Sequence, residues 1–291
     1  MKHAYLILAH NEFQVLKRLL LALDDSRNDV YIHFDKKVSE LPDLHLQHAN
    51  LHILKNRVDV KWGDVTVMEA ELNLFEAAHK NGEYSYYHLL SGVDMPIKSQ
   101  DYIHDFFNKH AGKEFIGFYQ GDITDEIDRK VMKTHLFSES FRTDSGLINL
   151  SKKVLRSAFI KFQEIINYKR NGDINFKKGT QWISITGEMV KILIKDRENI
   201  LKIYQNSFCC DEIVVQTACW NSELKKNIFD LNDEGRGCMR EIRWEKNVIR
   251  DWTENDYEYL THSDKLFARK FNSKSISAVD KILHYVQVNK T

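Results

Sequence analysis

The chain of 291 residues contains only two prolines, and its acidic and basic side chains balance. Lys and Arg together number 42, as do Asp and Glu, so the formal net charge is zero. A general nucleic-acid binder carries a net basic surface, so the balance argues against one, although it leaves room for local basic pockets. We find no low-complexity tract, internal repeat or linker, which predicts a single domain over residues 1–291.

Cysteine is also scarce. The four cysteines include an adjacent pair that cannot easily bridge, and they lack the C-x-x-C spacing of metal sites: Cys209, Cys210, Cys219 and Cys238. We therefore expect reduced thiols. The apolar run Tyr5–Leu8 is too short for a signal peptide or a membrane span. These absences predict a cytoplasmic protein.

Strand-like and helix-like segments alternate through the first half of the chain. The predicted strands are Tyr5–Ala9, Val30–Phe34, Leu51–Leu54 and Tyr84–Leu90, and the predicted helices are Phe13–Leu23, Val65–Ala78 and Asp101–His110. The alternation predicts an α/β fold with a mostly parallel sheet flanked by helices. Ligands bind beyond the carboxyl ends of such strands, where we find His10, Asp35 and Asp94.

The second half is less regular. We predict a strand at Gly179–Thr186 and helices at Lys152–Arg170, Glu188–Tyr204, Asp211–Trp220 and Ile276–Val288. The helix Lys152–Arg170 is basic and amphipathic. Its apolar stripe could lie on an anionic membrane, but packing on the protein's own core with the lysines in water is the commoner arrangement and the one we expect.

Two carboxylates, Asp211 and Glu212, begin a predicted helix, where the helix dipole favours negative charge. We expect Asp211 to cap the helix and to leave Glu212 free. Among bulky apolar neighbours, Glu212 could acquire a raised pKa and act as a general base. An ordinary acidic helix start is the alternative, and on this pattern alone it is the commoner one.

The chain has no Asp-x-Asp tripeptide, whose carboxylates can hold a divalent metal on a diphosphate. The closest match is Glu126-Ile127-Asp128, in a charged stretch that we expect to be exposed. Near the C-terminus, Arg269 and Lys270 instead lie between Phe267 and Phe271. Buried aromatic flanks would fix the backbone, and a fixed pair of cations suits a leaving diphosphate. A solvated face of alternating cations and core aromatics is the alternative.

Several further residues have a functional and a structural interpretation. Trp62 and Trp182 could stack on a sugar or a base, or pack in the core. Asp35 could accept a hydrogen bond from uracil or ribose, or end a strand in a turn. Asp94 could shape the floor of a pocket, or belong to a turn fixed by proline. His10 could approach a phosphate, or bind a backbone group in a loop.

Taken in order, these segments resemble the core-2/I-branching β-1,6-N-acetylglucosaminyltransferases and the related peptide O-xylosyltransferases of glycosyltransferase family 14. The order and spacing of the matching pieces cover nearly the whole chain. They are Tyr5–Asn11, Tyr31–Lys37, Val60–Gly63, His88–Ser99, Gly179–Thr186, Asp211-Glu212 and Phe267–Phe271.

The resemblance implies a GT-A-like, Rossmann-like fold and an inverting transfer from a UDP-sugar without a bound metal or other cofactor. It implies that residues 1–120 form a nucleotide-binding half and residues 121–291 an acceptor and catalytic half. The family's base matches Glu212. Its diphosphate clamp matches Lys270 and, in the xylosyltransferase branch, Arg269.

The resemblance also implies a role for an upstream arginine, for which Arg240 is a better match than Arg243 or Arg250. Asp35 and Lys37 match the uridine-binding region, and Trp62 matches a donor-site tryptophan.

The chain departs from the animal enzymes in lacking a membrane anchor and numerous cysteines. Gln181, beside Trp182 on the acceptor side, stands where the xylosyltransferases carry an aspartate. The form resembles a bacterial member that acts on lipid-linked oligosaccharides at the inner face of the membrane, with N-acetylglucosamine as the expected donor sugar. Xylosyl, glucosyl or galactosyl transfer, hydrolysis of a sugar nucleotide, and glycan binding without catalysis are the alternatives.

Overall fold

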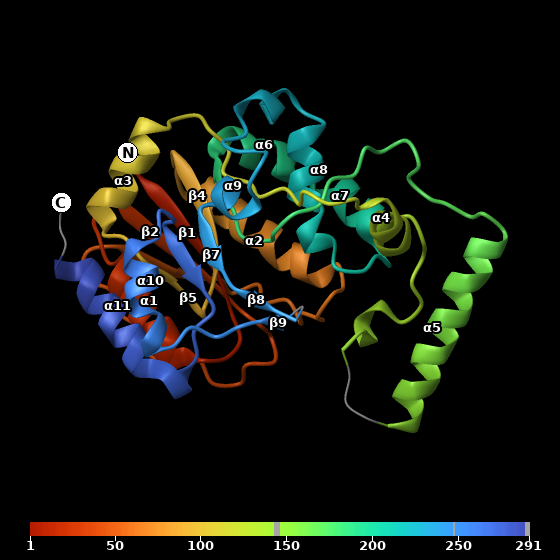
Figure 1. Cartoon of the computed structure of the whole chain (residues 1–291), viewed down its shortest axis with the longest axis horizontal. Helices are drawn as coiled ribbons and strands as arrows, with labels where there is room; N and C mark the ends of the chain where they lie inside the picture. Colours follow the sequence, from red (N-terminus) through yellow and green to blue (C-terminus); the bar gives the residue numbers. More distant parts are fainter. Residues whose placement is uncertain (143–145, 247, 289–291) are drawn as a thin grey trace.

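The computed structural model describes residues 1–142, 146–246 and 248–288. Its centre is a five-stranded sheet in the order β3-β2-β1-β4-β6 (Figure 1). The strands β1, β2, β3 and β4 are parallel, and β6 runs antiparallel to β4. The predicted α/β class and single domain are confirmed. The strands are β1 His3–Ala9, β2 Asn28–Phe34, β3 Asn50–Ile53, β4 Tyr86–Ser91 and β6 Ser184–Thr186.

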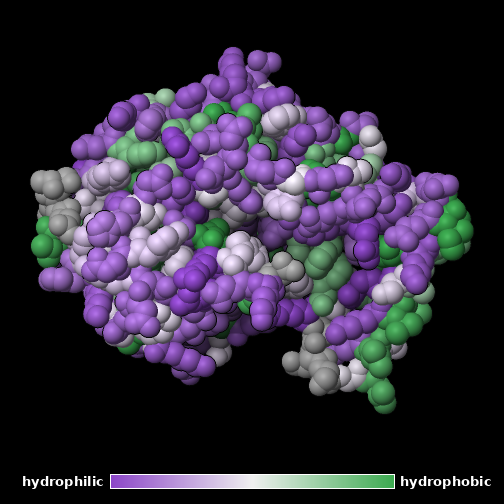
Figure 2. Space-filling view, in the orientation of Figure 1, coloured by the Kyte–Doolittle hydropathy of each residue, from purple (hydrophilic) through white to green (hydrophobic). Residues whose placement is uncertain are grey.

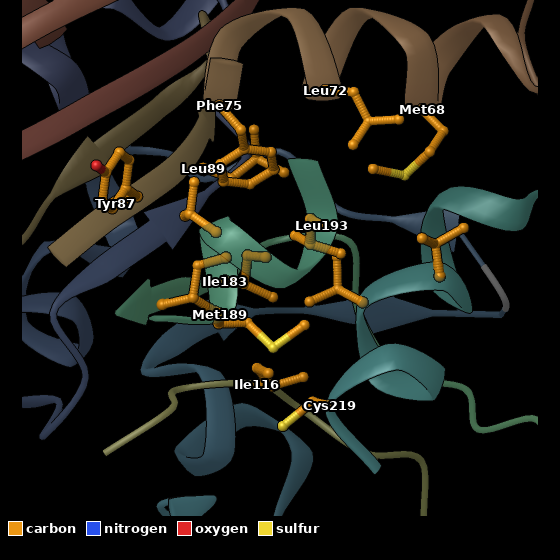
Figure 3. Packing of buried hydrophobic residues seen from close by; sticks show 14 of the residues in the cluster. Met68, Leu72, Phe75, Tyr87, Leu89, Ile116, Ile183, Met189, Leu193 and Cys219 are labelled. Atoms are coloured by element: carbon orange, nitrogen blue, oxygen red, sulfur yellow. The ribbon is translucent and has the colours of Figure 1, made fainter. Parts of the chain in front are cut away.

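Alternate side chains of β1 enter two hydrophobic layers, as the two-residue period of a strand requires. Leu6 lies in the layer beneath α2 (Thr66–Asn81) and α6 (Gly187–Lys195), whereas Tyr5 and Ile7 lie in the layer that includes α1 (Phe13–Leu23), α3 (Gln100–Lys109) and α11 (Ile276–Val288). Figure 3 shows the first layer, where Met68, Leu72 and Phe75 of α2 lie with Met189 and Leu193 of α6. The sheet is therefore covered on both faces.

A second, three-stranded sheet joins distant parts of the chain in the order β5-β10-β7. Its strands are β5 (Asp94–Pro96), β7 (Arg240–Ile242) and β10 (Phe267–Arg269). Arg269 is paired with Asp94 in the antiparallel ladder of β10 and β5. Phe267 is paired with Arg240 in the parallel ladder of β10 and β7. The sheet thus brings both arginines to the segment that follows β4.

The second half contains shorter elements than we predicted. The predicted helix Glu188–Tyr204 is two helices that meet at Asp196, and the predicted helix Asp211–Trp220 begins as a 3-10 turn. The strand predicted at Gly179–Thr186 is limited to β6. The helices here are α4 Thr124–Val131, α5 Leu147–Ile165, α7 Arg197–Tyr204, α8 Val214–Trp220, α9 Glu234–Cys238 and α10 Tyr257–His262. The 3-10 turns are η1 Ser138–Ser140, η2 Cys210–Glu212, η3 Glu223–Asn227, η4 Glu254–Asp256 and η5 Ser273–Ser275. Two short strands, β8 Trp244–Glu245 and β9 Val248–Ile249, pair antiparallel.

Helix α5 corrects one expectation. The prediction that the apolar stripe of Lys152–Arg170 packs on the core is wrong, because Leu155 and Phe162 are 53% and 54% exposed. The helix also starts and ends earlier than predicted, and it stands apart from the sheet (Figure 1). Within the described parts of the chain, no helix has the length and apolar content needed to cross a bilayer.

Candidate active site

A cavity of about 1910 Å³ opens beyond the carboxyl ends of β1 and β2. The residues after these strands line it, as the rule for parallel sheets predicts. All of the predicted site residues except Asp94 contribute to its wall. They are His10, Asp35, Lys37, Trp62, Gln181, Trp182, Glu212, Arg240, Arg269 and Lys270.

Asp94 lies beneath the cavity wall, where it is 1% exposed. Its Oδ2 accepts a hydrogen bond from the backbone N–H of Ser91 at 2.9 Å, and its Oδ1 accepts one from the Ser91 hydroxyl at 2.7 Å. Oδ1 also lies 3.2 Å from Nε of Arg269. Asp94 therefore contacts an arginine of the cavity and fixes its direction.

Arg269 is held between an aromatic ring and a carboxylate. Its guanidinium lies 3.8 Å from the ring centre of Trp182 on one side and pairs with Asp94 on the other. Only 11% of its side chain is exposed, and burial lowers its pKa from the ordinary value. Stacking and ion pairing hold a guanidinium in one orientation. Trp182 is itself largely buried and contacts Arg269, and it also lines the cavity, so its place on the acceptor side stays a prediction.

Lys270 has a different environment from its neighbour. Its side chain is 40% exposed, and Nζ lies 3.8 Å from Oδ1 of Asp251. Phe267 and Phe271 are buried, as predicted, and the peptide bond between Arg269 and Lys270 is cis. The two adjacent cations therefore comprise one fixed group and one that can adjust to a ligand.

Of the three upstream arginines, Arg240 is the one that lines the cavity. It is 2% exposed, and it donates to the carbonyls of Cys238 and Ile183 at 2.7 and 2.8 Å. Burial lowers its pKa to about 10. Arg243 and Arg250 lie outside the lining and pair with acidic side chains. Arg240 thus brings a charge to the wall, but most of its donors are used by the protein.

Glu212 is 34% exposed and is held by lysines. Lys130 donates to its Oε2 at 3.0 Å, and Nζ of Lys178 lies 3.9 Å away. The expectation of a free Glu212 beside a capping Asp211 is wrong, because helix α8 begins at Val214 with no side-chain cap and Glu212 is bound by Lys130. The local sequence did not indicate the lysines, since they come from other segments.

We predicted that the stretch Glu126-Ile127-Asp128 is exposed. This prediction is wrong, because Ile127 is buried and both acidic side chains are partly buried. Glu126 lines the cavity, with Oε1 at 2.8 Å from Nζ of Lys130 and 3.2 Å from Nζ of Lys178. Asp128 pairs with two other lysines. Among the residues that the structure describes, no group of three or more His, Cys, Asp and Glu side chains is placed to hold a metal ion. Glu126 therefore pairs with the same lysines as Glu212, whereas Asp128 pairs with others.

The sequence analysis missed Glu71, a fully buried carboxyl behind the acceptor side. Gln181 donates to its Oε1 at 2.6 Å. Burial, followed by the charge of Asp211, raises the pKa of Glu71 well above its usual value. Burial, followed by the charge of Glu212, raises the pKa of Asp211 to about 7. The sequence pattern could have predicted this burial, because Glu71 lies at helical spacing between Val67 and Leu74 on an apolar face.

The predicted uridine-binding residues also line the cavity. Asp35 is 7% exposed and accepts from the backbone N–H of Lys37 at 2.9 Å, while the Lys37 ammonium lies 2.9 Å from its Oδ2. Trp62 is 51% exposed, so its ring can meet a ligand. The guanidinium of Arg142, which sequence reasoning missed, lies 5.7 Å from that ring. His10, also exposed, lies on the wall nearby.

Gly179 allows its segment to lie close to the backbone of Gly117, which is outside the strands. A Cβ atom at this residue would lie 1.8 Å from the carbonyl oxygen of Gly117, a distance that no side chain tolerates. The Gly179 N–H donates to the carbonyl of Glu212 at 2.9 Å. A residue larger than glycine would therefore displace the backbone that carries Glu212.

Comparison with known proteins gives matches over most of this chain. The chain is 20% identical over 278 residues to a protein named xylosyltransferase oxt from Drosophila melanogaster, a match that covers 87% of this chain and 30% of the fly protein. It is 26% identical over 302 residues to a protein named beta-glucuronosyltransferase GlcAT14B from Arabidopsis thaliana, covering 96% of this chain and 64% of the plant protein. The chain thus spans less than two thirds of either relative.

The family model described as "Core-2/I-Branching enzyme" matches residues 3–270. This range includes the central sheet, the second sheet and every residue of the cavity discussed above. The resemblance that we found in the sequence is thereby confirmed at the level of the family. This chain belongs to the Core-2/I-Branching enzyme family.

Proposed function

We propose that the chain is an inverting, metal-independent glycosyltransferase that moves a sugar from UDP to a glycan hydroxyl in the cytoplasm. One observation carries the proposal: a single cavity in a chain of this family holds the carboxylate of Glu212 and the cations of Arg269 and Lys270. A carboxylate can deprotonate an acceptor, and paired cations can stabilise a departing diphosphate.

In the proposed reaction, Glu212 takes the proton from an acceptor hydroxyl. The oxygen forms a bond to the anomeric carbon on the face opposite UDP, and the bond from that carbon to the diphosphate oxygen breaks with its electron pair. The configuration therefore inverts. Lys130, which donates to Oε2 at 3.0 Å, orients the carboxylate. General-base catalysis of this kind supplies about 10²–10⁴-fold.

The leaving group gains negative charge as its bond breaks. In our proposal, Lys270 and Arg269 stabilise that charge, where other enzymes use a metal ion. Arg269 is fixed by Asp94 and Trp182, so little reorganisation is needed during the reaction. The terminal nitrogens of Arg240 are bound to carbonyls of the protein. Arg240 therefore contributes its positive charge from nearby and makes no direct hydrogen bond to the diphosphate in this proposal.

The remaining cavity residues divide between donor and acceptor in this proposal. Asp35 and Lys37 bind the uridine, Trp62 stacks on the donor, and His10 approaches the diphosphate. Gln181 faces the acceptor, because its amide is held from behind by the buried Glu71 at 2.6 Å.

We propose N-acetylglucosamine as the donor sugar, following the resemblance to N-acetylglucosaminyltransferases, and a lipid-linked oligosaccharide of a bacterial surface polysaccharide as the acceptor. The relatives named above add xylose and glucuronic acid as donors that need to be compared. Glucose and galactose complete the set, since all five sugars are carried on UDP.

A donor screen by UDP release tests the proposal. The chain is incubated with each of the five UDP-sugars, with and without an oligosaccharide acceptor. We expect one UDP-sugar to give UDP and an extended glycan only when the acceptor is present. UDP release without an acceptor would identify a hydrolase, and binding of a UDP-sugar without any release would identify a non-catalytic binding protein. Either outcome would contradict the proposal.

A further inference from the structure

The apolar face of α5 points away from the protein. Leu147, Ile148 and Ile165 are 86%, 74% and 79% exposed, and Leu155 and Phe162 lie on the same side at helical spacing. Figure 2 shows this face as an apolar band along the outer edge of the molecule at the lower right. Contiguous exposed apolar surface of this kind marks a site of interaction.

The polar face of the same helix is bound to the protein body. Arg156 donates to the carbonyls of Leu136 and Phe137 at 2.9 and 2.8 Å. Gln163 is 2% exposed, donates to the carbonyl of Thr134 and accepts from its N–H, each at 2.9 Å. These contacts fix the rotation of the helix about its axis. The apolar side therefore faces outward because the polar side is held inward.

The charges around the apolar face indicate its partner. Helix α5 carries four basic side chains against the single acid Glu164, in a chain whose charges balance overall, and of these four Arg156 is bound inward. Lys153 and Lys161 are exposed. A second copy of this chain would bring the same cations together, whereas an anionic lipid surface would pair with them. Helices with this pattern lie in the plane of a bilayer interface.

We propose that α5 docks the protein on the surface of an anionic lipid bilayer. The segment that leads into this helix carries Glu139 and Arg142, both of which line the cavity. Docking places the mouth of the cavity beside the membrane, where a glycan attached to a lipid is presented. This choice of acceptor rests on the proposed transferase activity, but the docking itself does not.

Flotation of the whole chain with lipid vesicles tests the proposal. One set contains phosphatidylcholine alone, and the other also contains phosphatidylglycerol. We expect binding to the second set and little to the first. The double variant Leu155→Glu/Phe162→Glu should bind at least tenfold more weakly, since two apolar anchors become anions. The matched control Leu41→Glu/Leu231→Glu changes exposed leucines elsewhere and should bind like the unaltered chain.

A second variant tests the charges separately. Lys153→Gln/Lys161→Gln keeps the apolar face and should weaken binding to the anionic vesicles roughly fivefold for each lysine. Thermal melting checks that both variants fold, and we expect no change because all the altered side chains are exposed. Unchanged binding of both variants, equal binding to the two kinds of vesicle, or no binding to either would overturn the proposal.

Sedimentation of the lipid-free protein tests whether a second copy of this chain, and not a lipid surface, covers the apolar face of α5. A dimer that Leu155→Glu/Phe162→Glu converts to monomers would show that a second copy covers the face, and would overturn membrane docking. Activity on a water-soluble acceptor is measured in parallel. If that variant keeps this activity and loses activity on an acceptor embedded in vesicles, the docking proposal is supported. If the unaltered chain floats but transfers no sugar, only the proposed function fails.

Discussion

The two ends of the cavity hold charge in different ways. At one end, Arg269 is oriented by a buried carboxylate and a tryptophan, and it remains a cation facing the cavity. At the other end, Glu212 lies near two lysines and next to Asp211, which is partly buried and also lines the cavity, while Glu71 is fully buried. In the proposed function, the cation end receives negative charge and the carboxylate end exchanges protons.

The difference shows how one fold can give each charge of a single cavity its own counter-charge. The cation end is held by the β5–β10 ladder, and the carboxylate end by the 3-10 turn before α8. Because separate elements position them, a change at one end should affect one step of the reaction and leave the other intact. The following predictions test this separation, beginning with the largest effect.

Glu212→Gln removes the proposed base but keeps the shape of the side chain. We expect turnover to fall by about 10²–10⁴-fold, while UDP binding stays within a small factor of that of the unaltered chain. UDP release and calorimetric titration with UDP measure the two quantities. Glu223→Gln, at a side chain that is 97% exposed outside the cavity, is the matched control. Near-normal turnover of Glu212→Gln would remove Glu212 from the role.

Lys270→Ala removes the adjustable cation of the other end. Charge-assisted hydrogen bonds contribute about 1.5–3 kcal/mol, so we expect UDP affinity to fall roughly 10- to 100-fold and turnover to fall with it. Calorimetry with UDP measures the affinity. Lys274→Ala, in the 3-10 turn that follows on the surface, is the control. An unchanged affinity for UDP would contradict the clamp and the comparison between the two ends.

Asp211→Asn tests the proton-holding end through stability. Burial raises the pKa of Asp211 to about 7, so the folded protein binds a proton that the unfolded chain releases above its ordinary pKa of about 4. The contribution of Asp211 to the free energy of unfolding is therefore fully present below about pH 4. This contribution decreases as pH rises towards 7, by up to about 4 kcal/mol. The variant should lose this part of the pH dependence.

Urea unfolding at several pH values measures that dependence. Asp173→Asn, at an exposed carboxyl, is the control and should keep the slope of the unaltered chain. Glu71, whose pKa is also raised, adds to the slope in the same direction and should remain visible in Asp211→Asn. A variant with the full original slope would show that Asp211 is ionised in the folded protein.

The smallest effect concerns metal ions. If the cation end stabilises the diphosphate by itself, treatment with EDTA should leave UDP release unchanged. The assay is the donor screen with the preferred UDP-sugar, before and after chelation. Complete loss of activity that manganese restores would contradict the metal-independent proposal, and it would give the carboxylates a different role.

The sequence was most informative where one local period decides the structure. The alternation of buried strands with amphipathic helices gave α1 and α11 their observed bounds and placed β1, β2 and β4 within two residues at each end. It failed at Asp196, where a long periodic stretch becomes two helices, and at Gly179–Thr186, where three residues pair as a strand. A period indicates which residues share a face, but it does not fix where tertiary contacts interrupt the element.

For the cavity, position in the strand order was enough to predict much of the wall. His10 and Asp35 line it because residues after parallel strands meet at one edge. The partners of Glu212 were beyond prediction, since Lys130 lies 82 residues away in the chain. Glu71 was predictable in principle, because a carboxyl on an apolar helical face must be buried or displace the helix.

By itself, the sequence determined the α/β class, the family resemblance and the amphipathic character of α5, because composition, order and period are local or additive properties. Tertiary structure decided which way α5 faces, which group pairs with Glu212, and that Asp94 fixes Arg269 from below. These depend on contacts between residues far apart in the chain. Their geometry follows from how the sheets and helices pack, and no single segment contains it.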